Sequence, residues 1–585
     1  MNYGKLKIRI IFLAIIFFGF FGLAQNSEAA TFYVATNGNN NNSGTEAQPW
    51  VTIQKAADTM VAGDTVIVKE GTYYEMVTMK NSGSPGSYIT YQAYPGHTVI
   101  IDGQNTRYEA IIAKSYSKVS GFILQNARYG LYAGGKNNII IDHIEARNNW
   151  DMGIYINNSS YVEINYCYLH HNQAGFYLAG PSSHITIDHC HTEYNVGGTS
   201  GIVLYAYPDS NANTYITVSD CESNNNGRQG LWAQFTKYLL VKNNHFHDNG
   251  ATGIQIETGC RYVVADNNIA EKNNNVFNGE YGIWFDETIN GIISNNISRE
   301  NQGGFSISQS HNIIMKNNFA YNNKAQQNQS SCTWCPASSG GLSVSAGHAE
   351  HLGAPYGATH NSIIHNVFYG NGRDNVSTWG AMRTLDNLTE IHDNYSKNNI
   401  ISQNPAVVDM NWIDTDAFAT NNYNLFYNAR ALLIKYAGTD YNFSGYKTAS
   451  GWDANSISSN PFFVNPSSDF HLQVSSPAIN AGDFLTKTTS AGSGISIPVT
   501  NAKYFSNGYG IIDGDLIKVG LNSPVSVVDV NYDANIITIN SSISWNNGDG
   551  VSYSYSGSRP DIGAYEYQFG GDITSPAAPS GLTVQ

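Results

Sequence analysis

The chain contains few charged residues, and basic residues are the scarcer kind. Charged side chains account for 13% of its 585 residues, with 30 lysines and arginines against 45 acidic residues and a formal net charge of −15 at pH 7. A nucleic-acid-binding protein needs a basic patch that faces the phosphates. This composition therefore argues against nucleic acid as a partner.

A long hydrophobic run is also missing. An apolar stretch at residues 10–24 is preceded by Lys5, Lys7 and Arg9 and followed by a small-x-small site that ends at Ala29. A membrane-spanning helix needs about 20 apolar residues, and this stretch is shorter. The pattern is typical of a secretory signal peptide at residues 1–29. We expect cleavage there, no membrane anchor afterwards, and a secreted, extracellular protein.

The chain has only six cysteines. Cys332 and Cys335 form a Cys-x-x-Cys motif, which in a secreted chain predicts a loop disulfide. No βαβ pattern surrounds the motif, which argues against a redox site, and a zinc site would need two more soft ligands nearby. Cys167, Cys190 and Cys221 are predicted to be buried free thiols.

A repeat of roughly 22 residues, a length typical of solenoids, dominates the middle of the chain. Four copies open at Gly230, Gly253, Gly282 and Gly304, and each contains three short apolar strands and an asparagine-rich corner. One such unit cannot bury its apolar face alone, so the repeat predicts stacked coils with a continuous core. A leucine-rich repeat has a similar period but would show a leucine-rich signature. We therefore predict an all-β fold, a right-handed parallel β-helix.

One corner position carries a small or amide side chain in every coil. Successive coils should lie about 4.8 Å apart, so these side chains are predicted to stack, with hydrogen bonds between the asparagines. The predicted ladder consists of Cys167, Cys190, Cys221, Asn244, Asn268, Asn296 and Asn318. It resembles the asparagine ladder of the pectate-lyase-like superfamily, which lies between the second and third sheets of each coil. The resemblance covers roughly residues 110–410 and implies a secreted protein that acts on polysaccharide; we expect a monomer.

The rest of the chain divides by pattern. Residues 30–110 predict an N-terminal cap and the first coils, with a short amphipathic helix at residues 52–60. Residues 111–410 predict the β-helix, and 411–483 its last coils and cap. Turn-rich strand patterns at 484–558 predict an inserted β module, followed by a closing strand at 559–567. Residues 568–585 resemble a linker and the start of a fibronectin type III module.

The strand after each opening glycine places alternate side chains outside the coil. Two outward rows result, one aromatic and one polar, and exposed aromatic rings suit stacking against sugars. The alternative is that inserted loops cover these rings. The predicted substrate-binding residues are Tyr155, Tyr177, Tyr205, Trp232, Gln234, Gln255 and Trp284.

Glu257 and Asp286 occupy matching outward positions on adjacent coils. Two carboxylates so close raise the pKa of one of them. In a retaining glycoside hydrolase they would be nucleophile and general acid. In a lyase they would bind Ca²⁺ with Gln234, while a basic residue removes a proton from the substrate.

The candidate bases for the lyase reaction are Lys237, Arg261 and Arg228, with Arg383 farther along the stack. The polygalacturonase motifs of the resembled superfamily are missing, as is the aspartate cluster of its calcium-dependent pectate lyases, so no catalytic residues transfer from it. The superfamily favours a Ca²⁺-assisted lyase of uronic-acid polysaccharide. A retaining hydrolase and a non-catalytic, adhesin-like protein with two ordinary surface acids remain alternatives. We interpret His245, His247 and Asp248 as part of a solvated turn rather than a metal cluster.

Overall fold

The computed structural model describes residues 29–273, 281–323, 340–345, 357–372, 382–385, 391–403, 410–412 and 417–568. The expected signal peptide lies outside these residues apart from its last position, as do the Cys332–Cys335 disulfide and nearly all of the tail at 568–585. Within the described ranges, no helix has the length and hydropathy of a membrane span.

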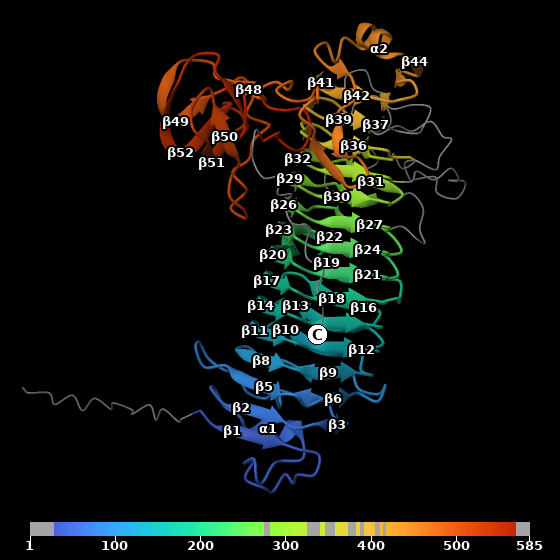
Figure 1. The fold of residues 1–585 in the computed structure, drawn as a ribbon. Helices are drawn as coiled ribbons and strands as arrows, with labels where there is room; N and C mark the ends of the chain where they lie inside the picture. Colours follow the sequence, from blue (N-terminus) through green and yellow to red (C-terminus); the bar gives the residue numbers. More distant parts are fainter. Residues whose placement is uncertain are drawn as a thin grey trace, which may run out of the picture.

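The described chain winds into a column of stacked coils with three parallel sheets along its length (Figure 1). In each coil the chain passes through the first, second and third sheet in that order. The prediction of an all-β parallel β-helix is confirmed. Side chains from all three sheets fill one continuous apolar core that runs from Val34 to Tyr446.

The first sheet has parallel neighbours throughout except for its last, antiparallel pair. Its strands are β4 (Val77–Thr78), β7 (Glu109–Ile112), β10 (Tyr129–Gly134), β13 (Met152–Asn157), β16 (Ala174–Ala179), β19 (Ile202–Tyr205), β22 (Leu231–Gln234), β25 (Ile254–Glu257), β28 (Tyr281–Asp286), β31 (Gly303–Ser308), β34 (Leu342–Ser345), β37 (Met382–Leu385), β40 (Met410–Trp412), β43 (Ile434–Tyr436) and β44 (Thr439–Tyr441).

The second and third sheets are parallel along their whole length. The second contains β1 (Thr31–Val34), β2 (Thr65–Val68), β5 (Ile89–Ala93), β8 (Ser117–Ser120), β11 (Asn137–Asp142), β14 (Ser160–Asn165), β17 (Ser183–Asp188), β20 (Asn213–Ser219), β23 (Thr236–Lys242), β26 (Arg261–Asp266), β29 (Ile289–Ser294), β32 (His311–Lys316), β35 (Ser362–Ile364), β38 (Asn394–Lys397) and β41 (Phe418–Asn422). The third contains β3 (Gly71–Tyr73), β6 (Val99–Asp102), β9 (Phe122–Gln125), β12 (Glu145–Arg147), β15 (Tyr168–His170), β18 (His191–Glu193), β21 (Glu222–Asn224), β24 (His245–His247), β27 (Ile269–Glu271), β30 (Ile297–Arg299), β33 (Phe319–Tyr321), β36 (Val367–Tyr369), β39 (Ile400–Ser402), β42 (Leu425–Tyr427) and β45 (Ile457–Ser458).

The coil-opening glycines stack in a column, as predicted. A Cβ atom on Gly253 would lie 2.7 Å from the carbonyl oxygen of Gly282, and one on Gly153 would lie 2.7 Å from that of Gly175. No side chain fits at that separation, so the close stacking of coils requires glycine at this corner.

The predicted corner ladder is present between the second and third sheets. Asn268 Oδ1 accepts hydrogen bonds from the backbone N–H of Asn244 at 3.0 Å and from its Nδ2 at 2.9 Å, while Asn268 Nδ2 donates to Val241 O and Asn296 Oδ1. In the coils before Asn244, cysteine thiols take the place of the asparagine side chains, and the N–H of Cys190 donates to the sulfur of Cys221. The three cysteines are free and buried, as predicted.

A second asparagine ladder, which we did not predict, closes the corner between the third and first sheets. Each amide again accepts from the N–H of the preceding coil's asparagine, for example Asn226 to Asn249 at 3.1 Å. Its members are Asn149, Asn172, Asn195, Asn226, Asn249, Asn273, Asn301, Asn323 and Asn371.

Short helices stand at the two ends of the column (Figure 1). Helix α1 (Ile53–Thr59) lies where the sequence indicated a helix and buries Ile53, Ala56 and Ala57 against the first coils. Thr52 accepts from the N–H of Lys55, and Glu75 accepts from the first two helical N–H groups at 2.9 Å each. Helix α2 (Phe443–Ser450) covers the other end and buries Tyr446. Both helices shield core side chains that an open end would expose to water.

Two later segments pack on the outside of the upper coils. A six-stranded sheet of β48 (Thr486–Lys487), β49 (Gly492–Pro498), β50 (Leu516–Val519), β51 (Val525–Asn531), β52 (Ile536–Trp545) and β53 (Gly550–Tyr553) projects from the column beside the second sheet (Figure 1). Its core includes Ile314 and Ile364 from the column, and Lys316 pairs with its Asp515. A cleft of about 680 Å³ lies between this module and the second sheet.

On the upper coils, from β30 to β42, the outer face of the third sheet is covered by the segments around β46 (Phe463–Asn465) and β47 (Asp469–Leu472), together with Ile562. The prediction of a closing strand at 559–567 is wrong, because these residues form bends and no strand. The segments bury apolar outward side chains of these coils that water would otherwise contact.

The ladder generates a stability prediction. Replacing Asn268 with alanine leaves the buried N–H of Asn244 and the carbonyl of Val241 without these partners, and each such loss costs about 1–3 kcal/mol. We expect the free energy of unfolding to fall by about 3 kcal/mol, measured by urea unfolding followed by circular dichroism. Asn268→Cys should lose less, because the sulfur can accept the same N–H as Cys221 does.

The matched control is Asn137→Ala, at an exposed position on the same column. It should change stability by less than about 0.5 kcal/mol. If Asn268→Ala is as stable as this control, the ladder does not carry the stabilisation assigned to it.

Candidate active site on the first sheet

The outward side chains of the first sheet line up in the register that strand alternation predicts. Trp232 pairs with Gln255, which pairs with Trp284, and Gln234 pairs with Glu257. Asp286 pairs with Ser308 on the next coil. The polar row and the aromatic row therefore run side by side across adjacent coils.

Outward aromatic side chains of the first sheet form a continuous strip on the coils that precede Glu257 in the sequence. Ring centroids lie 5.7 Å apart for Tyr155 and Tyr177, 6.5 Å for Tyr177 and Tyr205, and 5.9 Å for Tyr205 and Trp232. All four side chains are half-buried. Trp284 stands above this strip, where its Nε1 donates to Ser308 Oγ at 3.2 Å.

Glu257 is held by three N–H donors. Trp232 Nε1 and Gln234 Nε2 each donate to Oε1 at 2.7 Å, and Gln255 Nε2 donates to Oε2 at 2.6 Å. Gln255 is oriented in turn by Gln229, whose Nε2 donates to its Oε1 at 2.6 Å. An ionised carboxylate is the form that accepts all of these bonds, because a protonated one needs an acceptor for its own O–H.

Asp286 has the opposite environment. Burial raises the pKa of its carboxyl well above the ordinary value, and the negative charges of Glu257 and Glu287 raise it further. Gln309 Nε2 donates to Oδ1 at 3.3 Å, which opposes the shift only weakly. The site thus pairs a glutamate that accepts three N–H bonds with an aspartate whose pKa is raised.

The candidate bases are not gathered around this pair. Lys237 lies on β23 of the second sheet, where its Nζ is 3.1 Å from both carboxylate oxygens of Asp209, in the 3₁₀ helix η1 (Asp209–Asn211). Arg261 pairs with Lys237 in the sheet register, and its Nε is buried without a hydrogen bond among the described residues. Arg228 is exposed in the loop before β22. The side chain of Arg383 lies outside the described residues.

The proposed calcium ligands do not fit a Ca²⁺ site in this arrangement. Ca²⁺ takes six to eight oxygen ligands, whereas the oxygens of Glu257 face N–H groups and Asp286 Oδ1 accepts from Gln309. Gln234 turns its NH₂ group, not its oxygen, toward Glu257. Two neighbouring carboxyls in such different surroundings resemble the acid and base pairs of enzymes.

The chain resembles known proteins along most of the column. A model described as "Pel9A-like, right handed beta helix region" matches residues 32–186, and one described as "Right handed beta helix region" matches residues 198–349. Both descriptions are of right-handed β-helix regions, so the chain resembles the pectate-lyase-like superfamily along residues 32–349. Glu257 and Asp286 lie in the second, general β-helix match and outside the Pel9A-like one.

Curated relatives match the chain over short stretches. The uncharacterized protein YwoF of Bacillus subtilis is 32% identical over 137 residues, 21% of this chain and 28% of the relative. Pectate lyase PEL9 of Emericella nidulans is 29% identical over 150 residues, 23% of this chain and 37% of the relative. The chain therefore spans about a third of the length of these relatives.

Similar solved structures include a rhamnogalacturonan lyase, with 17% identity, a TM-score of 0.35 and coverage of 58% of this chain and 82% of that one. Pectate lyase Pel9A matches with 15% identity and a TM-score of 0.33, and the match covers 92% of this chain and 96% of that one. At these identities, such likenesses concern the β-helix fold and not its chemistry.

Sequence reasoning missed the residues that orient the pair. Gln309 follows β31 in a left-handed backbone conformation, with φ of 47°, and Gln229 lies in the loop before Gly230. The repeat pattern predicts only which strand residues point outward. It could not indicate side chains that reach the site from corners and loops.

Because the pKa of Asp286 is raised, its effect on folding stability should depend on pH in a direction that can be predicted. An unfolded aspartate loses its proton near pH 3.9, while the folded one keeps it, so folding becomes less favourable as pH rises above that value. Asp286→Asn removes this cost. We expect the variant to melt at a higher temperature than the wild type at pH 7, and the difference to vanish below about pH 3.9.

Thermal melts across pH 3 to 8 measure this effect, with Asp533→Asn, an exposed position in the module, as the control. The control should shift the melting temperature little at any pH. A variant Asp286→Asn that is less stable than the wild type at pH 7 would show that Asp286 is ionised in the folded protein.

Proposed function

We propose that this chain is an extracellular glycoside hydrolase in which Asp286 is the general acid and Glu257 the nucleophile. The supporting observation is the difference between the two carboxyls, since Glu257 accepts three N–H bonds and Asp286 is half-buried beside it with a raised pKa. Pairs of this kind divide the acid and base roles in enzymes that cleave glycosidic bonds.

The reaction follows from these states. Asp286 transfers its proton to the glycosidic oxygen as the bond from that oxygen to the anomeric carbon breaks, and Glu257 bonds to the anomeric carbon. The aspartate then takes a proton from water, whose oxygen displaces Glu257 and restores both groups. Adjacent strands lie about 4.8 Å apart, which is close to the carboxyl spacing of about 5–5.5 Å in retaining enzymes.

The aromatic strip supports a polymeric substrate. Tyr155, Tyr177, Tyr205 and Trp232 follow one another along the column axis and end at Glu257, so a sugar chain lying along the strip would contact successive rings. Amphipathic rings suit such contacts because the sugar covers their apolar surface. Trp284 would contact the chain on the far side of the carboxyl pair.

Lyase activity is the second candidate, because pectate lyase PEL9 is a curated relative. Elimination requires a base near the substrate, and Lys237 would first have to leave Asp209. Arg228 and Arg261 are the other cations near this part of the column. If a uronic-acid polymer is the substrate, its carboxylates would also approach Glu257, which is unfavourable without a cation.

Product analysis tests the proposal. Incubation with neutral and uronic-acid polysaccharides should release reducing ends without the absorbance of an unsaturated sugar. Glu257→Gln and Asp286→Asn should each lower turnover by about 10²–10⁴-fold, the usual contribution of acid or base catalysis, with or without added calcium. Glu163→Gln changes an exposed outward glutamate on the second sheet and should leave turnover unchanged.

Three outcomes would contradict the proposal. An absorbing product that requires calcium would establish the lyase reaction. Binding without cleavage would indicate an adhesin-like protein. Unchanged turnover in Glu257→Gln and Asp286→Asn would place the chemistry elsewhere on the molecule.

A further inference from the structure

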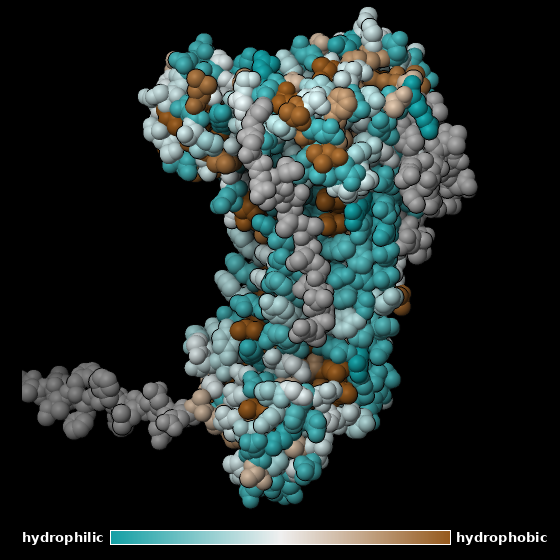
Figure 2. Space-filling view, viewed as in Figure 1, coloured by the Kyte–Doolittle hydropathy of each residue, from teal (hydrophilic) through white to brown (hydrophobic). Residues whose placement is uncertain are grey.

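The outer face of the third sheet carries a second set of polar groups, away from the carboxyl pair on the first sheet. Here histidines and acids alternate along the column, and the coils around β24 and β27 present a hydrophilic surface (Figure 2). Glu145 contacts His170, Glu222 contacts His247, and Glu271 contacts His245.

Three of these side chains come from two neighbouring strands, β21 and β24. The register pairs Glu222 with His245 and Asn224 with His247, so all four lie on the outer side, while Ser223 and Phe246 are buried beneath them. The sequence placed His245 and His247 on the third strand of their coil, and the structure has them there, but half-buried and not in a solvated turn. The preceding coil supplies a carboxylate, Glu222, that the local sequence does not reveal.

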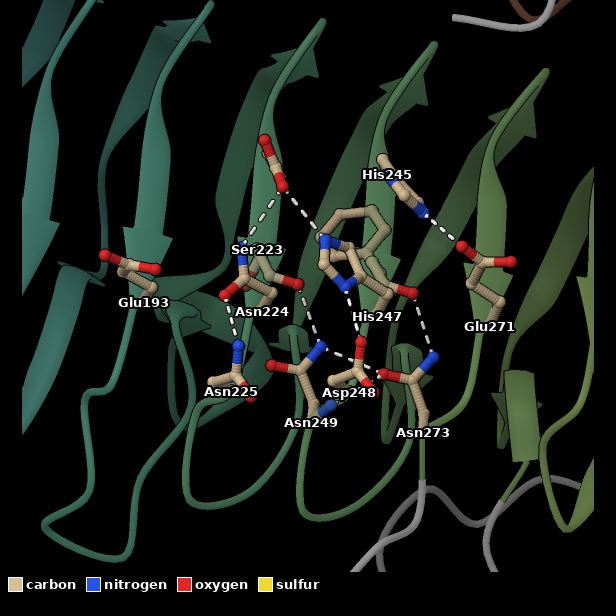
Figure 3. Close-up of polar contacts among 12 residues, drawn as sticks. Glu193, Ser223, Asn224, Asn225, His245, His247, Asp248, Asn249, Glu271 and Asn273 are labelled. Atoms are coloured by element: carbon tan, nitrogen blue, oxygen red, sulfur yellow. Dashed lines mark hydrogen bonds and ion pairs between the residues drawn. The ribbon is translucent and has the colours of Figure 1, made fainter. Parts of the chain in front are cut away.

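The three side chains lie close together. One ligand atom each from Glu222, His245 and His247 lies within 4.8 Å of the others. His247 Nε2 is 2.9 Å from Glu222 Oε1, and the two imidazole rings are 4.2 Å apart with an interplanar angle of 31°. Figure 3 shows the ring of His245 directed toward Glu271, whose Oε1 lies 3.0 Å from its Nε2, so His245 would leave this partner on binding an ion.

Neighbouring groups orient these ligands. His247 Nδ1 lies 2.8 Å from Asp248 Oδ2, and Asn224 Nδ2 donates to Glu222 Oε1 at 3.2 Å (Figure 3). A carboxylate on the far nitrogen of a histidine is the usual support of a metal-binding imidazole. Nε2 of His247 faces Glu222 Oε1, so a metal ion bound there would take the place of a proton between the two side chains.

We propose that Glu222, His245 and His247 bind one divalent transition-metal ion of the Zn²⁺ class. Two imidazoles and one carboxylate favour such an ion over Ca²⁺ or Mg²⁺, which prefer oxygen ligands. Three protein ligands leave a fourth position for water. The ion joins two adjacent coils, and this site does not depend on the proposed hydrolase activity.

A second cluster offers a matched comparison. Asp188, His189 and Asp220 also place their ligand atoms within 4.8 Å of one another, but they contribute one nitrogen and two oxygens. His189 lies at a corner in a left-handed backbone conformation, with φ of 50°. This oxygen-rich set suits a Zn²⁺-class ion less well than two histidines held on one strand.

Metal titration tests the proposal. Tag-free protein is stripped with chelator, dialysed and titrated with ZnCl₂ in a calorimeter, and bound zinc is counted by mass spectrometry. We expect one Zn²⁺ per chain, a higher melting temperature, and no matching response to CaCl₂. His245→Ala and His247→Ala should each weaken binding at least about tenfold, and Asp248→Asn by about 10–100-fold.

Cobalt gives an independent readout, because Co²⁺ in a four-coordinate site absorbs visible light strongly, and His247→Ala should abolish that spectrum. His189→Ala is the control and should bind zinc as the wild type does; circular dichroism checks that each variant is folded. The proposal is overturned if the wild type takes up no zinc, if folded His245→Ala and His247→Ala bind it unchanged, or if His189→Ala removes the binding.

Discussion

The hydrogen bond between buried asparagine amides of adjacent coils is the interaction on which the column depends. Each corner turns the chain while main-chain N–H groups face the interior, where water cannot satisfy them. Asn244 shows the solution, because its N–H and its Nδ2 both reach Asn268 Oδ1 while the same Nδ2 bonds to Val218 O. The second ladder repeats this geometry, so in the coils from Asn244 to Asn318 amides close two of the three corners and fix the coil spacing.

The same spacing organises the surface. A residue before each corner adopts a left-handed backbone, which costs a side chain other than glycine about 1–2 kcal/mol. Where these residues are tyrosines, their rings stack, as in Tyr215, Tyr238 and Tyr262 with centroids 4.7 Å and 4.9 Å apart and nearly parallel planes. Stacking stabilises each aromatic pair by about 0.5–1.5 kcal/mol. The stacked rings therefore offset much of the free-energy cost of the left-handed backbone at these residues.

The sequence allowed the coils, the glycine column and the first ladder to be predicted, because each depends on one residue type at a fixed period. The second ladder escaped notice although five of its asparagines stand three or four residues before an opening glycine, as Asn249 does before Gly253, because insertions separate the others from their glycines. The outward row of Glu257 and Asp286 was predictable for the same periodic reason. Contacts between distant segments, such as Asp209 with Lys237, have no period and could be read only from the structure.

Acids elsewhere on the column help to interpret the carboxyl pair. On the third sheet Glu145, Glu193, Glu222 and Glu271 each have a cationic or histidine neighbour, as Glu271 has in His245 and Arg299, while Asp102 accepts from Gln125 and Asn126. On the second sheet Asp266 faces Lys242. Most of these acids are therefore balanced by a positive charge or a histidine on the same or an adjacent coil, where acids alone would repel one another. Glu257 is instead held by neutral N–H donors, and burial and nearby negative charge raise the pKa of Asp286. A departure of this kind from the pattern of the same molecule, at a cost to stability, is expected where a side chain serves a reaction rather than the fold.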